Sequence, residues 1–337
     1  MIGAKFSSQI KMNNLSLKKK IIFSLIALFL FLLIAELGIK AILFLTRNKE
    51  VVFINSKGFR GAEFNIEKDP KKIRVIMMGN SVTFGITPEN CPYPTQLQEL
   101  FNQKYSNKVE VINAGVEGYS SEYVLKRLKY DILQYKPDII TIYVGWNDLY
   151  AVNPLSPWSS KKLTGLANFL NKFYLYKAFR RVIFLSIKPK IEQKFMNNTY
   201  NQNIEDIYQK FEPVIYKENL KKIIETAREN KIKLVLINLA SILSDKMTEN
   251  DIKKVHYPYF TSDIEKLKIL QNRYNVAIED IAKEEVTLID LNKAINQIPD
   301  KGKLFFDTMH PYCEGQKIIA ETIFNDLISQ KLLNLVK

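Results

Sequence analysis

Four short blocks of this sequence carry the residue types that nucleophilic catalysis needs. The blocks are Gly-Asn-Ser at 79–81, Asn-Ala-Gly-Val-Glu-Gly at 113–118, Gly-Trp-Asn-Asp at 145–148 and Asp-Thr-Met-His-Pro at 307–311. Ser81 supplies a hydroxyl nucleophile. Asp307 lies three residues before His310, and in a turn this spacing lets the carboxylate accept a hydrogen bond from one imidazole nitrogen. The other nitrogen of His310 is then free to take a proton from a serine.

The small numbers of histidines and cysteines restrict the chemistry further. The chain has two of each, so histidine-dependent catalysis must use either His256 or His310. His256 has no acidic residue three positions before it, and we interpret it as a surface or capping residue. Two histidines argue against a multi-histidine metal centre, and two cysteines exclude a zinc site of the CxxC type. We expect neither a metal site nor a cofactor.

Continuous apolar stretches alternate with amphipathic segments along most of the chain. Five stretches are predicted to be strands, at 73–79, 109–113, 139–145, 233–238 and 286–290. Helices are predicted at 95–105, 120–135, 218–230, 262–282 and 313–333. Buried strands that alternate with helices are typical of an α/β domain with a mostly parallel sheet. The expected fold is therefore a three-layer α/β/α domain around a five-stranded sheet.

Each of the first three blocks lies at or directly after the end of a predicted strand. Because ligands bind at the carboxyl ends of the strands in open α/β sheets, we expect Ser81, Gly118 and Asn147 to lie at one edge of the sheet. The serine block is not the G-x-S-x-G of an α/β-hydrolase elbow, since the next glycine falls four residues after the serine. It matches neither a P-loop nor a dinucleotide fingerprint.

Taken in this order, the four blocks resemble those of the SGNH hydrolases, also called GDSL-type esterases and lipases. The resemblance covers roughly residues 71–330 and implies a flavodoxin-like α/β fold and a serine enzyme that cleaves esters. It implies that Ser81 is the nucleophile, His310 the general base and Asp307 the residue that orients the histidine. It also implies an oxyanion hole formed by the backbone N–H groups of Ser81 and Gly118 and by the side chain of Asn147.

One residue departs from the family pattern, because Asn80 stands where the first block usually has aspartate. Since Asp307 remains to orient His310, we expect this departure to leave the mechanism intact. Residues 55–61, Asn-Ser-Lys-Gly-Phe-Arg-Gly, also resemble the segment that precedes the domain in membrane-anchored members. The alternative for these residues is a pair of turn glycines beside the membrane.

The N-terminal residues have the composition of a membrane anchor. The tail at 1–20 carries five lysines and no acidic residue, and 21–45 is almost entirely apolar. At about 1.5 Å rise per residue, this stretch can cross a bilayer core of about 30 Å. A cleaved signal peptide is the competing interpretation, but no A-x-A cleavage pattern precedes Glu36 and we favour an uncleaved anchor. A juxtamembrane segment at 46–70 follows, and the hydrolase-like domain is expected at 71–330.

Equal flanks of 15 residues on the two sides of this span, at 6–20 and 46–60, hold four basic residues each, so the positive-inside count does not decide the orientation. Three lysines at 18–20 directly precede the span, and the N-terminal tail is short. Both features favour an N-terminus in the cytoplasm and a catalytic domain outside it. The protein is therefore expected to be a single-pass membrane protein, with membrane lipid around its N-terminal helix.

The net charge of the chain is +14, from 49 Lys and Arg against 35 Asp and Glu. The tail contributes +5, and residues 151–194 contribute +8 from nine basic residues and one acidic residue. The rest of the chain is nearly neutral, which argues against a general polyanion-binding protein. No nucleic-acid-binding motif accompanies the basic residues, so nucleic acid is not an expected partner.

The segment at 151–213 is too long for an ordinary connection and is predicted to be an insertion with a role. Basic and aromatic residues are interleaved in it. Two interpretations remain open. The insertion either caps the active-site edge and lies against an anionic membrane surface, or forms a solvated basic helical pair packed on the domain.

The two cysteines follow the serine block and the histidine block. If the domain is exported, Cys91 and Cys313 can form a disulfide, because both loops are expected to converge on the active site. Two free thiols are the alternative. Neither cysteine has a base at motif spacing, which argues against a catalytic cysteine.

Together these features predict a membrane-anchored serine esterase that hydrolyses O-acyl esters of a glycan or a lipid through an acyl-enzyme. An O-acyltransferase that moves the acyl group to a cell-surface glycan would use the same serine. A non-catalytic domain that binds anionic polymers is the alternative from another class of protein, and it would not need Ser81.

Overall fold

A computed structural model of the chain describes residues 16–45, 54–87, 91–152, 154–155, 173, 175–176, 204–258 and 260–333. By packing, the chain divides into two compact units. The first is Met1–Glu50 together with Lys162–Ile191, and the second is Val51–Lys161 together with Glu192–Lys337. The second unit contains all four sequence blocks.

In the first unit, helix α1 runs over Leu17–Leu45 and covers the predicted apolar span. The helix is long and apolar enough to cross a membrane, a property that signal sequences share. Glu36 is 7% exposed although most of the helix is exposed. Its carboxylate lies 3.5 Å from the Lys40 ammonium and accepts a hydrogen bond of 2.6 Å from the Leu175 backbone. A residue of the predicted insertion therefore contacts α1.

The second unit is built around a sheet of five parallel strands. They are β1 (Ile73–Gly79), β2 (Val109–Gly115), β3 (Ile139–Tyr143), β4 (Lys233–Ile237) and β5 (Thr287–Ile289). Their order is β2-β1-β3-β4-β5, so β1 lies between the strands that carry the glycine and asparagine blocks. The predicted five-stranded α/β fold is confirmed. The strands of this sheet are almost continuously apolar because helices cover both of its faces.

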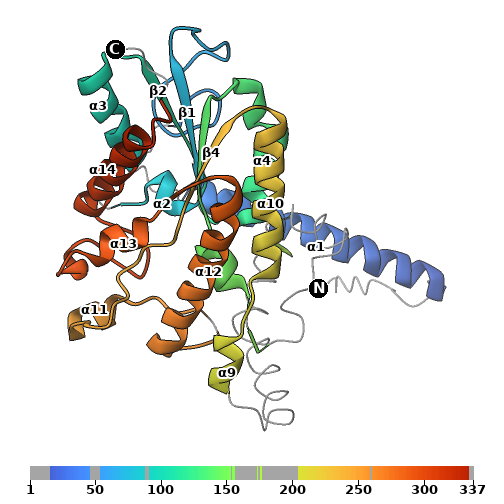
Figure 1. The fold of residues 1–337 in the computed structure, drawn as a ribbon. Helices are drawn as coiled ribbons and strands as arrows, with labels where there is room; N and C mark the ends of the chain where they lie inside the picture. Colours follow the sequence, from blue (N-terminus) through green and yellow to red (C-terminus); the bar gives the residue numbers. More distant parts are fainter. Residues whose placement is uncertain are drawn as a thin grey trace, which may run out of the picture. The chain divides into compact units, whose positions relative to one another are not determined.

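Helices cover the two faces of this sheet (Figure 1). On one face lie α3 (Tyr93–Tyr105) and α14 (Cys313–Ser329), and on the other lie α4 (Ser121–Tyr130), α10 (Val214–Glu229) and α12 (Ile264–Glu285). The shorter helices are α2 (Ser81–Phe84), η1 (Ile132–Tyr135), α5 (Trp146–Ala151), α9 (Ile204–Gln209), α11 (Glu249–Lys254), α13 (Leu291–Asn296) and η3 (Lys301–Lys303). Each of the five predicted long helices has a counterpart, with ends that differ by a few residues.

The predicted helix at 120–135 is interrupted. It forms α4 and then the 3₁₀ helix η1, with the break at Asp131, whose φ is −130°. Lys136 ends η1 with a φ of +50°, and Pro137 follows. A residue before proline avoids the α region, so the helical path has to end there.

Most of the predicted insertion at 151–213 lies outside the described residues. The described part contains α9 and the residues that lead into α10. The interpretation of the insertion as a cap stays a prediction.

Arg74 joins the segment before the sheet to the sheet itself. Its side chain is 1% exposed and forms an ion pair of 2.6 Å with Glu110 on β2. The guanidinium also donates to the backbone carbonyls of Asn65, Ile66 and Tyr135, at 2.7 to 3.0 Å. Because all of these partners surround one buried cation, its removal leaves several acceptors unsatisfied.

We predict that Arg74→Met lowers the free energy of unfolding by about 3–5 kcal/mol, the usual cost of breaking a buried ion pair. Urea unfolding of the full-length protein measures this change. Lys126→Met is the matched control, because Lys126 forms an exposed i,i+4 pair with Glu122 and should cost about 0.5 kcal/mol or less. Equal losses in the two variants would contradict the prediction.

Candidate active site

Ser81 begins a one-turn helix directly after β1, which lies between β2 and β3 in the sheet. The Asn80 side chain caps this helix by accepting a 3.0 Å hydrogen bond from the Val82 N–H. Aspartate and asparagine are about equally good at this position, so Asn80 provides a local function that the usual aspartate would also provide. Gly79 is required for close packing, because a Cβ there would collide with the side chain of Thr83 and with the carbonyl of Tyr143.

The hydroxyl of Ser81 faces the imidazole of His310, with 2.7 Å between Oγ and Nε2. On the other side of the ring, Nδ1 lies 2.7 Å from Oδ2 of Asp307. An ionised carboxylate accepts only, so Nδ1 carries the proton and Nε2 is the acceptor for the serine hydroxyl. The three residues form one continuous hydrogen-bonded chain.

A tight turn holds Asp307 and His310 together. Phe305 pairs with Pro311 in an antiparallel bridge, and the Phe306 N–H donates to the His310 carbonyl at 3.1 Å. The Phe306 ring stacks on the His310 imidazole, with 5.7 Å between ring centroids. These contacts place the histidine before any substrate is bound.

The surroundings of Asp307 favour its ionised form. Burial acts to raise the pKa of this carboxyl group, but hydrogen bonds and charge attraction from His310 outweigh it. The backbone N–H groups of His310 and Met309 also donate to Oδ1, at 2.8 and 2.9 Å. The net result is a lowered pKa, so Asp307 is a carboxylate when His310 needs an acceptor.

The three expected oxyanion donors lie at the carboxyl edge of neighbouring strands. Ser81 stands in the first turn of α2, where backbone N–H groups have no helical acceptor. Gly118 has a φ of +75° and open space where a Cβ would lie, so this conformation favours glycine and leaves the backbone approachable. The side-chain amide of Asn147 donates to the Tyr119 carbonyl at 3.0 Å, which leaves its second N–H for another acceptor.

Asp148, the neighbour of Asn147, is a buried carboxyl group that sequence reasoning did not assign. It is 8% exposed. Burial raises its pKa to about 6, and the negative charge of Glu122 adds to this effect, whereas hydrogen bonds from Ser121 oppose it.

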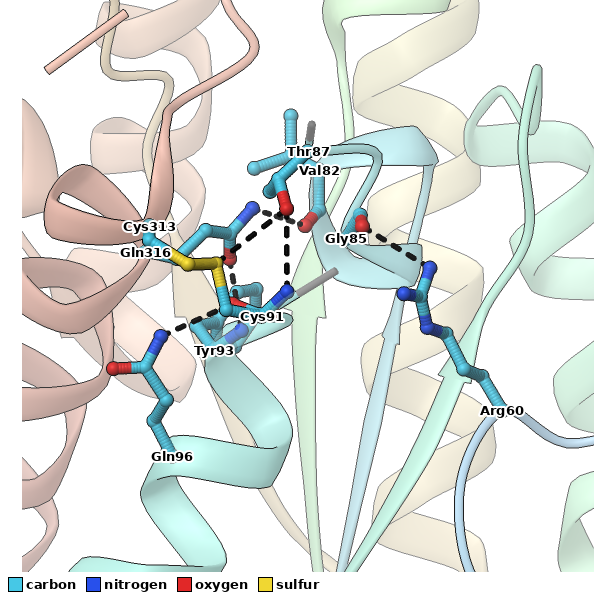
Figure 2. Close-up of a disulfide and its surroundings, with 9 residues drawn as sticks. All are labelled: Arg60, Val82, Gly85, Thr87, Cys91, Tyr93, Gln96, Cys313 and Gln316. Atoms are coloured by element: carbon cyan, nitrogen blue, oxygen red, sulfur yellow. Dashed lines mark hydrogen bonds between the residues drawn. A yellow bond between two sulfur atoms is a disulfide. The ribbon is translucent and has the colours of Figure 1, made fainter. Parts of the chain in front are cut away.

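A disulfide joins the segment after the Ser81 helix to the helix that follows His310. Cys91 and Cys313 are bonded, with 5.5 Å between their Cα atoms, which decides between the two alternatives left by the sequence. Figure 2 shows Gln316 next to this bond. Gln316 is fully buried and accepts from the Tyr93 N–H at 2.8 Å while it donates to the Val82 carbonyl at 3.3 Å.

Arg60 provides a second contact to the nucleophile helix. Its guanidinium donates to the Gly85 carbonyl at 3.0 Å, also drawn in Figure 2, and lies 4.6 Å from the centroid of the Phe84 ring. Its backbone N–H donates to the Asn113 carbonyl at 3.3 Å. The segment at 55–61 therefore contacts both the end of α2 and the glycine block, and its interpretation as a simple turn does not account for these contacts.

His256 is exposed, as predicted, but its backbone lies against the histidine block. Its N–H donates to Oγ1 of the buried Thr308 at 2.7 Å, and this hydroxyl donates to the His256 carbonyl at 2.9 Å. The His256 ring stacks on Tyr150, which follows the asparagine block. No spacing rule links position 256 to position 308, so the sequence carried no signal for this contact.

Within the described ranges, no group of three or more His, Cys, Asp or Glu side chains comes together in a way that suits a metal ion.

A parallel sheet with a serine after one of its inner strands, placed against a histidine from a distant loop, is the architecture of an α/β serine hydrolase. The sequence matches the profile of the GDSL-like Lipase/Acylhydrolase family over residues 77–318, and the chain belongs to this family. It is therefore an enzyme that acts on ester bonds. No curated protein matches the sequence.

The solved structures to which this chain is similar include LAE5 and Axe2. LAE5, an α/β hydrolase enzyme from the metagenome of Lake Arreo, Spain, is 14% identical over 78% of this chain and 97% of that chain, with a TM-score of 0.47. Axe2, an acetylxylan esterase from Geobacillus stearothermophilus, is 15% identical over 76% of this chain and 94% of that chain, with a TM-score of 0.48.

The raised pKa of Asp148 predicts a specific pH dependence of stability. A carboxyl group with a pKa of about 6 in the folded state, against a reference value of 3.8, binds its proton more tightly when folded. Its contribution to stability is present below the unfolded pKa and is lost as the pH rises through about 6. Asp148→Asn cannot titrate. Relative to this variant, wild type should lose about 2 kcal/mol of unfolding free energy between about pH 4.5 and about pH 7.5.

Urea unfolding of both proteins across this pH range measures the difference. Ser121→Ala is the companion variant, because it removes a hydrogen bond that lowers the pKa of Asp148 and should move the pH range upward. A difference between wild type and Asp148→Asn that does not change with pH would be incompatible with this account.

Proposed function

We propose that this protein is a serine esterase in which Ser81 is the nucleophile, His310 the general base and Asp307 the residue that orients the base. The observation that carries the proposal is the hydrogen-bonded chain from Ser81 through His310 to Asp307, with both distances at 2.7 Å. A general base must lie within hydrogen-bonding reach of the proton that it removes. These residues meet this requirement without any rearrangement.

In the acylation step, Oγ of Ser81 attacks the ester carbonyl while its proton moves to Nε2 of His310. Asp307 stabilises the imidazolium that forms, and it remains ionised throughout. When the tetrahedral intermediate collapses, the C–O bond to the alcohol breaks and the proton on Nε2 passes to the departing oxygen. The enzyme is left as an acyl ester of Ser81, and His310 is again neutral.

The second half of the reaction uses the same groups with water. His310 takes a proton from the water as it attacks the acyl-enzyme, and the acid leaves when Oγ of Ser81 recovers a proton. In both halves a negative charge develops on the former carbonyl oxygen. We assign the N–H groups of Ser81 and Gly118 and the amide of Asn147 as its hydrogen-bond donors, each worth several kcal/mol when it is preorganised.

The proposed substrates are O-acyl esters of a glycan or a lipid at the cell surface, with acylated glycans as the first class to test. The proposal rests on the ester chemistry of the family and on the proposed location of the enzyme. Assays with and without a glycan acceptor distinguish hydrolysis from acyl transfer, because transfer requires the acceptor hydroxyl in place of water.

We also propose that α1 anchors the enzyme in the membrane and that the catalytic unit lies outside the cytoplasm. The apolar length of α1, the three lysines in its first turn and the Cys91–Cys313 disulfide support this location. Disulfides persist in oxidising compartments and are rare in the cytosol. The anchor would keep the active site near acyl esters of the envelope.

Fluorophosphonate labelling tests the catalytic assignment. Ser81→Ala and His310→Ala should abolish labelling and lower kcat by about 10³-fold or more, because each removes a member of the proton-transfer chain. Asp307→Asn should lower kcat by about 10²- to 10⁴-fold, since the amide no longer selects the required tautomer.

His256→Ala is the matched histidine control and should keep its labelling, because its side chain only stacks on Tyr150. Thermal unfolding of each variant confirms that it is folded. Persistent labelling of a folded Ser81→Ala variant would refute the assignment.

The disulfide gives a test of location. In intact cells, Cys91 and Cys313 should not react with maleimide unless a reductant is added first. The double variant with both cysteines replaced by serine should lose about 2–5 kcal/mol of stability, because a long loop is no longer closed in the unfolded chain. Mass spectrometry of the mature protein shows whether the N-terminal helix is retained. Two thiols that react without reductant would place the domain in the cytoplasm.

A further inference from the structure

Asp148 occupies an unusual position for a carboxylate. It is 8% exposed, and the charge that acts on it comes from another carboxylate, Glu122 on α4. The hydroxyl-bearing rings of Tyr216 on α10 and Tyr274 on α12 also face it. Desolvation without a cation is costly, so the position calls for an explanation that packing alone does not provide.

Asp148 accepts hydrogen bonds from Ser121, the first residue of α4. The backbone N–H of Ser121 donates to Oδ2 at 2.9 Å, and the Ser121 hydroxyl donates to Oδ1 at 2.5 Å. The hydroxyl in turn accepts a hydrogen bond of 2.9 Å from the Asn219 amide on α10. A buried polar chain therefore runs from Asn219 through Ser121 to Asp148.

This series of hydrogen bonds connects α5, which carries Asn147, to the start of α4, which follows Gly118. Ser121 begins α4, three residues after Gly118, and Asp148 directly follows Asn147 in the first turn of α5. A second link runs parallel to it, because the Asn147 amide donates to the Tyr119 carbonyl at 3.0 Å. Two adjacent residues of the asparagine block thus hold two residues of the loop after the glycine block.

We propose that Asp148 is a positioning residue, which sets the placement of Asn147 relative to Gly118 through its hydrogen bonds to Ser121. The inference rests on the proposed oxyanion role of these two donors. Donors stabilise an oxyanion only when they lie within a few tenths of an ångström of the required place. The hydrogen bonds from Ser121 to Asp148 and from Asn147 to Tyr119 restrict how far Asn147 can move away from Gly118.

The chemistry of the chain explains why the residue is an aspartate. A carboxylate accepts only, so it fixes the Ser121 hydroxyl as a donor and leaves the oxygen of that hydroxyl free to accept from Asn219. An asparagine at this position could still accept the Ser121 N–H through its oxygen. Its NH₂ group would, however, compete with Asn219 for the hydroxyl oxygen, and the hydroxyl proton would lose its acceptor. An alanine would remove the hydrogen bonds to Ser121 and leave only the link from Asn147 to Tyr119.

A cavity of about 150 Å³ lies against this chain, and its lining includes Asp148, Asn219 and Tyr216. It leaves part of the carboxylate surroundings without tight packing. The hydrogen bonds to Ser121 hold the Asp148 carboxylate beside this cavity.

The test is a mutant cycle on the full-length enzyme with an acetyl ester as substrate. Asp148→Ala should lower kcat by about 10- to 100-fold and leave KM within about threefold, because the loss affects the transition state. Asp148→Asn should recover most of the activity, to within about 10-fold of wild type. Asn147→Ala should lower kcat by about 10²- to 10³-fold.

The decisive member is the double variant Asn147→Ala/Asp148→Ala. If Asp148 acts by placing Asn147, the double variant should be no more than about threefold slower than Asn147→Ala alone. Losses that multiply would overturn the inference, as would a kcat of Asp148→Ala equal to that of wild type. If Asp148→Ala fails to fold, Ser121→Ala replaces it in the cycle, with an expected loss of about 3- to 10-fold from one hydrogen bond.

Asp280→Ala is the control, because Asp280 forms an exposed pair with Lys283 on α12, and its kcat should equal that of wild type. Labelling of Ser81 by a fluorophosphonate separates the two levels of the interpretation. If wild type is not labelled at Ser81, the proposed function itself fails. If labelling at Ser81 is normal and the cycle is multiplicative, only the role of Asp148 is refuted.

Discussion

The hydrogen bond between Ser81 and His310 joins two residues that lie 229 positions apart in the sequence. A hydrogen bond of this kind contributes only about 1 kcal/mol of net stability, so it cannot hold the two segments together by itself. The fold has to supply that constraint. It does so where the helix after His310 meets the helix of Ser81, since the Cys91–Cys313 disulfide and the two hydrogen bonds of Gln316 fix α14 against α2 and the start of α3.

The same principle extends around the carboxyl edge of the sheet, because backbone groups and buried polar side chains link each block to the next. The Val116 N–H donates to the Gly79 carbonyl at 3.1 Å and so joins the glycine block to the serine block. The bonds of Asn147 and Asp148 join the asparagine block to the glycine block. Thr308 binds the backbone of His256, which in turn accepts from the Tyr150 hydroxyl three residues after Asn147. The reacting groups are thus set by a closed series of backbone and buried polar contacts.

The parts of this arrangement that were predictable from the sequence are those set by local physics. The apolar runs gave the strands to within about two residues, and the spacing of Asp307 and His310 gave their shared turn. The order of the blocks along the chain put the serine, glycine and asparagine residues at one edge of the sheet. The partners of these residues were not predictable, because Gln316, Ser121 and Asn219 meet them only after long segments fold back. No periodicity or motif spacing relates Asn219 to Asp148.

Asp148 lowers the free energy of unfolding at neutral pH, and we interpret this loss as the consequence of its positioning role. A neutral side chain of the same size would avoid the desolvation of a charge beside Glu122, and at neutral pH the ionised form lowers the stability of the folded state. In return, the Asp148 carboxylate can only accept hydrogen bonds. It therefore fixes the direction of each hydrogen bond in the series from Asn219 through Ser121 to Asp148. Local rules of burial are broken most often where function requires a defined geometry. Asp148 lies one residue from Asn147, a proposed oxyanion donor. This position agrees with a residue that lowers stability and fixes the position of its neighbour.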